Sequence, residues 1–506
     1  MKLLNECYRH GLNEPDSFIL HELDYYEGSY VAFQIYMKAP CDCVVNTGKH
    51  FAYTPESFNN LWVVCDAQLS FVEAVMTEKG MMYDRLEDNS QKVYRQGEDI
   101  ILWAYGTSFK DFIEVSIYMQ ACGMKANMIE QQKIIVNNCG KINLRKQYLD
   151  LWMHPTTLAR YYNVEPYSDR HFAILKRYLE TLIPVGVRTI TVIASDAPWH
   201  GQSKLFHDNH IANIFENNMV TVHRDPLCFD FSNLWRYIQL CMHVGLGPTI
   251  EVFGLAGVWN KQIQVYSDLN YLNEDEIEEY MHALYDFFVE KQCVDDVIVA
   301  IDEPENKELL YEEIAELKRK YPRYRVQCAI DKSDFIKDGR GAIDRLVTSF
   351  FTACQCSAEF DGWYICCGPD EPNTFISSDL IDIRYLAYLT KYFHAEKLLR
   401  WAYVAFPEKP NEDGRFLDFR AGDSYLIYPG NDGYPRLSLR YYQLIRFYEE
   451  MNLLAQDTAL YKQVFCFKDI REILQDQYGV KEHAYIKDYE FYRKLRRKLV
   501  RLQKGS

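Results

Sequence analysis

From Leu149 onward, strand-like apolar runs alternate with amphipathic helical segments, and this alternation constrains the fold more than any other feature. Short apolar runs of this kind are typical of buried parallel strands. Several of the intervening segments begin with Asp or Ser, which suit a helix N-cap. Eight strands joined by crossover helices predict a (β/α)₈ TIM-like barrel rather than an open sheet. The expected strands are 149–154, 189–194, 249–254, 296–302, 325–330, 345–351, 362–367 and 398–405.

The chain before Leu149 has a different pattern. Short β-rich runs are separated by turn-forming segments with no long helical period, as in an antiparallel sandwich. After Pro429 the sequence becomes mainly helical, beginning with residues 437–456. We therefore predict an α/β protein with a β-sandwich over 1–145, a barrel that carries the chemistry over 146–436, and a helical C-terminal region over 437–506. The expected sandwich strands are 31–37, 61–66, 99–106, 112–119 and 133–138.

The last helical segment carries Phe491, Leu495, Leu499 and Leu502 on one face and basic residues on the other. A helix of this kind can lie on a membrane surface or pack against its own protein. Because the chain as a whole is acidic, we expect this helix to dock on the body of the protein.

Charge and cysteine usage disfavour several classes of partner. The formal net charge of −16 argues against nucleic acid, whose phosphates would be repelled. No apolar stretch resembles a signal peptide, and no uncharged apolar run of about 18 residues could span a membrane. The 15 cysteines include the close pairs Cys41/Cys43, Cys354/Cys356 and Cys366/Cys367, which lack the CxxC spacing of a zinc site. We therefore predict a cytoplasmic protein with reduced thiols, no metal and no cofactor.

Two adjacent acids follow the fourth predicted barrel strand, in the order Asp302, Glu303, Pro304. Barrel enzymes place their chemistry at the carboxyl ends of the strands. Adjacent carboxyl groups oppose joint ionisation, so one can stay protonated while the other is charged. Pro304 is expected to keep Glu303 out of the helical region, in an extended conformation. The alternative is a simple turn in which Asp302 caps the next helix.

Several further segments follow one another along roughly residues 145–450. They are CFDFSNLWRYIQLCMHVGLG, VIVAIDEP, DGWYICCGPDEPNTF, LLRWAYVAFP and AGDSYLIYPGNDG, with a weaker match in LDLWMHPTTLARYYNVEPYS. Together they resemble glycoside hydrolase family 123 and its uncharacterised relatives. The family's members with known activity are retaining β-N-acetylgalactosaminidases that use the substrate's own 2-acetamido group as nucleophile. The resemblance implies that Asp302 orients the acetamido group and that Glu303 is the acid/base.

Aromatic residues make up 15% of the chain, and aromatic rings stack on the apolar faces of sugars as well as packing cores. Trp401 matches a family Trp at the start of the last barrel strand and is the expected sugar platform. For Trp401 and the other candidates a structural role is an alternative: packing between barrel and helices for the aromatic residues, a turn for Asn373 and Asp423, and a structural loop histidine for His200. The remaining substrate-binding candidates are Tyr403, Trp363, Tyr364, Asn373, Asp423, Trp199 and His200.

Three functions remain open. The first is the substrate-assisted β-N-acetylhexosaminidase. The second is a retaining glycosidase for a sugar without a 2-acetamido group, which needs a separate carboxylate nucleophile; Asp196 and Asp331 are the candidates. The third is a non-catalytic carbohydrate-binding protein, because fold alone does not fix activity. In each case the expected partner is an oligosaccharide or glycoside, and a homo-oligomer is compatible with the sequence.

Overall fold

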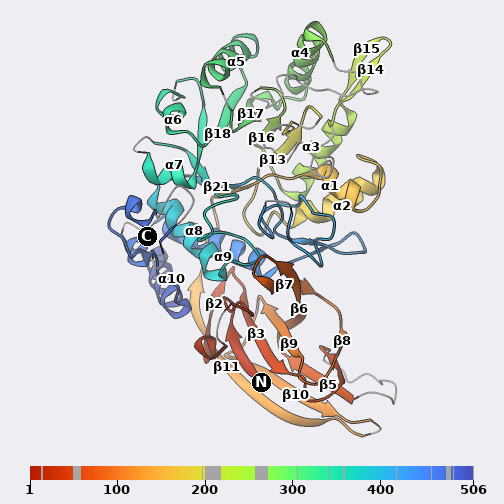
Figure 1. Ribbon diagram of the computed structural model, residues 1–506, viewed down its shortest axis with the longest axis vertical. Coiled ribbons are helices and arrows are strands. Elements are labelled where there is room, and N and C mark those ends of the chain that lie inside the picture. The colour runs from red at the N-terminus through yellow and green to blue at the C-terminus, as the bar shows by residue number, and fades with distance from the viewer. Residues whose placement is uncertain are drawn as a thin grey trace.

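The computed structural model comprises a sheet-rich N-terminal part, an α/β part with a curled parallel sheet, and helices near the C-terminus that lie beside both (Figure 1). No helix within the described parts of the chain is both long and apolar enough to cross a membrane. The 15 cysteines are all free thiols. The structure describes residues 1–12, 15–48, 59–122, 124–196, 198–199, 218–256, 272–304, 306–339, 341–356, 359–416, 419–456, 459–474, 480–481 and 484–504.

The N-terminal part forms two sheets around an apolar core that includes Phe33, Phe71 and Trp103. All five strands expected from the sequence are present, together with six others. Two strand pairs, β2 with β11 and β4 with β5, are parallel rather than antiparallel. One sheet has the order β1 (Lys2–Asn5), β3 (Val31–Lys38), β9 (Asp99–Gly106), β6 (Gln68–Thr77), β7 (Gly80–Glu87). The other has the order β2 (Glu22–Glu27), β11 (Asn127–Lys141), β10 (Phe112–Gln120), β5 (Asn59–Cys65), β4 (Cys43–Asn46), β8 (Gln91–Tyr94).

The second part contains an eight-stranded parallel sheet, and each predicted barrel strand occurs in it. The two end strands of the order, β12 and β13, are not joined by a ladder. A single described bond links the segments that contain them, from the Met153 amide to Thr191 Oγ1 at 3.2 Å. The sheet is thus a TIM-like barrel with one seam. Its order is β12 (Leu149–Leu151), β21 (Lys397–Arg400), β20 (Gly362–Tyr364), β19 (Arg345–Ser349), β18 (Arg325–Ile330), β17 (Val297–Asp302), β16 (Ile250–Phe253), β13 (Ile190–Ile193).

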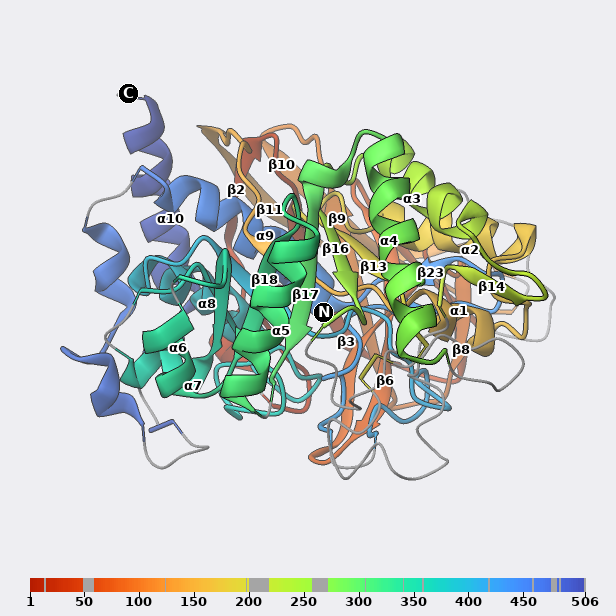
Figure 2. The same ribbon diagram turned by 90° about the horizontal axis from the view of Figure 1, so that it is seen from above.

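Helices cover the outside of this sheet, as Figure 2 shows for α5 beside β17 and β18. Several begin at a polar cap: Ser168 caps α2, and Asn273 forms a reciprocal capping box with Glu276 at the start of α4. The helices are α1 (Pro155–Tyr161), α2 (Asp169–Glu180), α3 (Ser232–Val244), α4 (Glu274–Glu290), α5 (Lys307–Lys320), α6 (Ser333–Gly339), α7 (Phe350–Gln355), α8 (Leu380–Tyr392), α9 (Leu439–Leu454) and α10 (Tyr489–Lys504). Two small hairpins are added, β14 (Thr221–Arg224) with β15 (Leu227–Asp230), and β22 (Tyr428–Pro429) with β23 (Pro435–Arg436).

A polar network fills the base of the barrel. Lys397 Nζ lies 2.5 Å from Asp150 Oδ2, 2.8 Å from Gln327 Oε1 and 3.2 Å from Glu251 Oε1. Burial and the neighbouring Asp150 raise the pKa of Glu251 to about 7. Because β16, β18 and β21 are not neighbours in the sheet, these side chains meet inside the barrel. The network therefore shows that Asp150, Glu251, Gln327 and Lys397 face the axis of the barrel.

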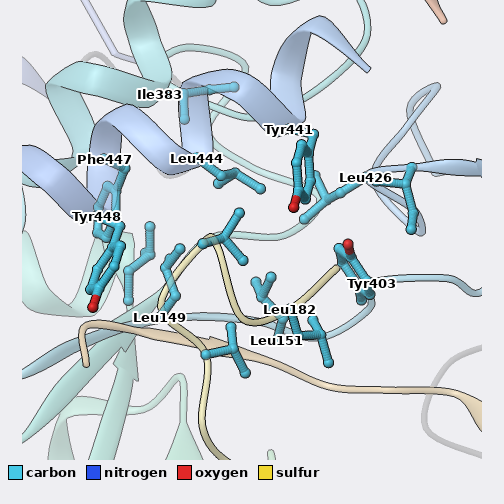
Figure 3. Close-up of a cluster of buried hydrophobic side chains, with 14 of the residues drawn as sticks. Leu149, Leu151, Leu182, Ile383, Tyr403, Leu426, Tyr441, Leu444, Phe447 and Tyr448 are labelled. Atoms are coloured by element: carbon cyan, nitrogen blue, oxygen red, sulfur yellow. The ribbon is translucent and has the colours of Figure 1, made fainter. Parts of the chain in front are cut away.

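Helix α9 lies between the barrel and the sandwich and is buried along most of its length. Figure 3 shows Tyr441, Leu444 and Phe447 of this helix in one apolar cluster with Leu149 and Leu151 of the first barrel strand. This cluster packs the outer face of the barrel against a helix that also contacts the sandwich.

The basic face of α10 docks on acidic side chains of the protein. Arg493 Nη1 lies 3.0 Å from Asp24 Oδ1, and Arg497 also pairs with Asp24, on β2. Arg496 pairs with Glu449 of α9. These ion pairs place the helix where its charge pattern suggested. The domain limits drawn from the sequence remain predictions, because α9 and α10 pack on the sandwich as well as on the barrel.

The hairpin between β6 and β7 reaches the barrel loops. Glu78 at its tip accepts a hydrogen bond from the Ala421 amide through Oε1 at 2.8 Å. Met76 exchanges backbone hydrogen bonds with the loop after β21, from its own amide to Glu412 O at 2.9 Å and from Gly414 N to its carbonyl at 3.0 Å. The sandwich thus supports the loop that carries Asp423.

Candidate active site

Asp302 and Glu303 lie at the carboxyl end of β17. The register pairs Asp302 with Ala329, and the Glu303 amide donates to Ala329 O at 2.9 Å. Glu303 has a φ of 42°, in the left-handed region, so the predicted extended conformation is wrong. Pro304 disfavours only the right-handed helical region. A non-glycine residue held in this strained region is a frequent feature of functional sites.

The capping alternative for Asp302 is also wrong. The N-cap of α5 is Asn306, whose side chain accepts a hydrogen bond from the Leu309 amide at 2.9 Å. Asp302 is partly exposed at the tip of its strand.

Glu303 is held by Tyr364, whose hydroxyl donates to Glu303 Oε1. Tyr364 ends β20, three strands away in the sheet, so the carboxyl reaches across the mouth of the barrel. Burial and the negative charge of Asp331 raise the pKa of Glu303, while Tyr364 and Lys332 partly offset this rise. A carboxyl group that keeps its proton to higher pH suits a general acid.

The strand register decides which aromatic residue of β20 faces the axis. Gln327 points into the barrel, and Ala329, two residues later, points the same way. Ala329 pairs with Val347, which in turn pairs with Gly362. Gly362 and, two residues later, Tyr364 therefore also point into the barrel. The residue between Gly362 and Tyr364 therefore points outward.

Trp363 is that residue, and it is fully buried against the helices. Its Nε1 donates to Thr390 Oγ1 of α8 at 3.0 Å, and its ring lies 5.2 Å from that of Phe393. Trp363 therefore packs between barrel and helices and does not line the mouth, in contrast to its place among the candidate residues.

Aromatic rings form one wall of the mouth. Trp401 is partly exposed, and its ring centroid lies 5.2 Å from Phe419 and 5.9 Å from His154. His154 also lies 5.0 Å from the ring of Trp199, which stacks on Trp152 at 6.1 Å. The structure thus brings two candidates, Trp401 and Trp199, to the same wall. His200 lies outside the described residues.

Asp423 is a buried partner of Arg400 rather than an exposed loop residue. Its Oδ1 accepts from Arg400 Nη2 at 2.7 Å and from Trp401 Nε1 at 3.4 Å. Burial raises the pKa of Asp423, although Arg400 opposes this shift. Arg400 also donates to Ile365 O at 2.7 Å. This pair therefore fixes the indole of Trp401 relative to the end of β20.

Two other candidates are structural in this fold. Tyr403 is fully buried, its hydroxyl lies 2.7 Å from Thr181 Oγ1, and it belongs to the cluster in Figure 3. Asn373 is fully buried, and its amide donates to the carbonyls of Cys366 and Pro369 at 3.1 and 2.7 Å. Neither side chain reaches the mouth, because each is occupied within the core or its own loop.

The two alternative nucleophiles lie in different surroundings. Asp196 follows β13, is buried, and accepts from the Asn218 amide at 3.0 Å. Asp331 follows β18 and is exposed, close enough for its charge to act on Glu303.

Arg400, His154 and Trp152 were not among the residues predicted for the site. Arg400 carried a usable signal, since a charged residue inside the apolar run LLRWAYVA needs a buried partner. Across the described residues, no three His, Cys, Asp or Glu side chains are arranged to hold a metal ion.

Comparison with known proteins agrees with this architecture. The family model for the glycoside hydrolase 123 catalytic domain matches residues 152–456. A family 123 glycoside hydrolase from Clostridium perfringens, whose structural analysis concerns glycolipid glycan hydrolysis, superposes with a TM-score of 0.71 and 16% identity, covering 100% of this chain and 97% of that one. A family 5 xyloglucanase from Bacteroides ovatus gives a TM-score of 0.26 and 8% identity over 78% of this chain and 93% of its own. No curated protein matches the sequence.

Proposed function

Since this chain belongs to glycoside hydrolase family 123, we propose that it is a retaining β-N-acetylgalactosaminidase-like enzyme that uses the substrate's acetamido group as nucleophile. The observation that carries the proposal is the partly buried Glu303 carboxyl, hydrogen-bonded to Tyr364 and adjacent to Asp302 at a barrel strand end. One protonated and one charged carboxyl are the two groups that this mechanism needs.

An ordinary retaining glycosidase places a nucleophilic carboxylate about 5–5.5 Å from the acid, on the other side of the sugar. When the acetamido oxygen attacks the anomeric carbon instead, no such carboxylate is required. Asp302 then accepts a hydrogen bond from the acetamido N–H and balances the positive charge of the oxazolinium. Glu303 protonates the leaving oxygen and afterwards takes a proton from the water that opens the ring.

The aromatic wall supports a sugar substrate. Trp401 offers a partly exposed indole to the apolar face of a ring, and Asp423 holds that indole in place. The C. perfringens relative is described for glycolipid glycans. We propose a small oligosaccharide or glycoside that ends in an N-acetylhexosamine as the substrate class here.

The role of Glu303 is tested with leaving groups of different acidity. Glu303→Gln should lower kcat by about 10²–10⁴-fold for glycosides with poor leaving groups and far less for activated aryl glycosides. The reason is that a good leaving group needs no proton. Glu308→Gln, an exposed change in the first turn of α5, is the matched control and should leave both rates unchanged. Equal losses for both kinds of substrate would remove Glu303 from the acid role.

The role of Asp302 is tested with a thiazoline mimic of the oxazoline intermediate. The mimic should inhibit competitively, and Asp302→Asn should weaken it and lower kcat together, because the site is shaped for the intermediate. A 2-hydroxy glycoside should hardly be cleaved.

The retaining glycosidase with a protein nucleophile remains the second candidate, because Asp331 lies close enough to act on Glu303. Efficient cleavage of the 2-hydroxy glycoside, abolished by Asp331→Asn and insensitive to the thiazoline, would establish that reading in place of the first.

A further inference from the structure

Two adjacent thiols lie at the same end of the barrel as the acid pair. Cys366 and Cys367 follow β20, and Tyr364, two residues earlier, holds Glu303. Cys367 is exposed and Cys366 is partly exposed, and both are free. Neither has a role in the proposed mechanism.

The backbone under this pair is fixed by buried side chains. Asn373 Nδ2 donates to Cys366 O at 3.1 Å, and Arg400 Nη1 donates to Ile365 O at 2.7 Å. The two thiols lie within hydrogen-bonding reach of each other, and the charges of Asp423 and Glu303 act on Cys366.

The nearest carboxyl is that of Asp423. Asp423 is fully buried, and the Cys367 thiol lies within hydrogen-bonding reach of it. Its Oδ1 also accepts hydrogen bonds from Arg400 and Trp401. A group bound by the two sulfurs would therefore lie beside the carboxylate that positions Trp401.

Adjacent thiols bind an external atom more readily than they bind each other. Consecutive Cα atoms are about 3.8 Å apart, whereas a relaxed disulfide needs about 4.4–6.8 Å, so a Cys366–Cys367 disulfide would be strained. A thiophilic atom that bridges the two sulfurs through longer bonds avoids this restriction. Soft thiolate ligands select soft metals and metalloids.

We propose that Cys366 and Cys367 form a binding site for trivalent arsenicals and other soft centres that take two sulfur ligands, and that occupancy blocks the catalytic mouth. With an organoarsenic(III) oxide, two As–S bonds form and the As–O bond breaks. The two thiol protons leave with the oxide oxygen as water, and no atom changes oxidation state. The hydrogen bond with the Cys367 thiol, together with burial, raises the pKa of Cys366, so alkylation of this thiol by a monofunctional reagent is slow.

The binding claim is independent of the proposed function, whereas the blocking claim rests on it, so the experiment measures both. Phenylarsine oxide is added to the full chain, and adducts are counted by intact-protein mass spectrometry and located by peptide mapping. The wild type should bind one equivalent at this pair, released by 2,3-dimercaptopropanol. Cys366→Ser and, separately, Cys367→Ser should each weaken binding by about 100-fold or more, because the second thiol acts at high effective concentration.

The matched control is Cys41→Ser in the sandwich. The thiols of Cys41 and Cys43 also lie within reach of each other, but Cys43 is fully buried. Cys41→Ser should therefore leave the binding of phenylarsine oxide as in the wild type. Unchanged binding by both Cys366→Ser and Cys367→Ser, or loss of binding by Cys41→Ser, would overturn the assignment. Hydrolysis of an aryl glycoside should stop on binding and return with the dithiol. Hydrolysis that continues while the thiol pair is occupied would overturn the blocking claim. A wild type that hydrolyses no glycoside would refute the proposed function, and mass spectrometry would still show whether the arsenical binds at Cys366 and Cys367.

Discussion

Replacement of Asp84 by alanine tests whether the sandwich and the barrel unfold together. Asp84 lies on β7, is fully buried, and accepts from Arg9 Nη1 at 2.9 Å, Arg440 Nε at 2.8 Å and the Tyr428 hydroxyl at 2.8 Å. Burial alone would raise its pKa, but Arg440 and Arg9 hold the pKa below its ordinary value. The alanine variant leaves two buried guanidinium groups without this carboxylate, which costs about 3–5 kcal/mol.

The size of the melting shift depends on how much of the chain unfolds at once. The entropy of unfolding is about 2.1 cal/mol/K per residue, or about 1 kcal/mol/K for 506 residues. If the whole chain melts in one transition, Tm should therefore fall by about 3–5 °C. If residues 1–145 melt alone, the corresponding entropy is about 0.3 kcal/mol/K and their Tm should fall by about 10–15 °C. Since Asp84 joins the N-terminal segment, a sandwich strand and α9, we expect the smaller shift in a single transition.

Differential scanning calorimetry measures both quantities. Glu27→Gln is the control, because its ion pair with Lys141 is exposed, with 67% and 58% of the two side chains accessible. Such a pair contributes about 0–1 kcal/mol, so Tm should change by no more than about 1 °C. An early, separate transition that moves by ten degrees or more in the Asp84 variant would refute the shared unit. An unchanged Tm would refute the energetic argument itself.

Two further predictions concern the mouth of the barrel. Tyr364→Phe removes a hydrogen bond that favours the charged form of Glu303, so the pKa of Glu303 should rise and the alkaline limb of kcat/KM should move to higher pH. Asp331→Asn removes a negative charge that raises this pKa, so the alkaline limb should move to lower pH, by an amount that shrinks as salt is added. Trp401→Ala should raise KM while Trp401→Phe restores most of the binding, whereas Tyr403→Phe should lower stability by about 1 kcal/mol without changing KM. A pH profile that stays in place, or a KM effect at Tyr403 equal to that at Trp401, would contradict these assignments.

The barrel strands could be predicted because the apolar composition of a buried parallel strand can be recognised within the segment itself. Runs such as 296–302 are apolar along their whole length and are bounded by helical patterns. Much of the sandwich escaped prediction for the opposite reason. Strand β7, GMMYDRLE, mixes buried and partly exposed residues, and its buried Asp84 resembles a surface residue in sequence. The distant Arg9, Arg440 and Tyr428 explain why a carboxylate lies inside.

The site was predictable where it depends on strand ends and not where it depends on side-chain direction. The position of Asp302 and Glu303 follows from the end of β17. The choice between Trp363 and Tyr364 depends on the register passed across several strands, which no single segment contains. The left-handed φ of Glu303 likewise comes from tertiary contacts, since Pro304 leaves two backbone regions open.

The seam between β12 and β13 is the line along which the barrel should deform most easily. Elsewhere the described sheet is held by ladders of backbone hydrogen bonds, but here a side chain, Thr191, makes the link to Met153. Amides that face the seam should therefore exchange with deuterium sooner than those inside the ladders. Trp152 lies just beyond the end of β12, where it is buried and stacks on Trp199, and a shift of β12 relative to β13 would break no ladder between the two strands. The acid pair lies on β17, which only β16 separates from β13 at the seam, and the ladders of β17 to β16 and β18 keep that strand in register.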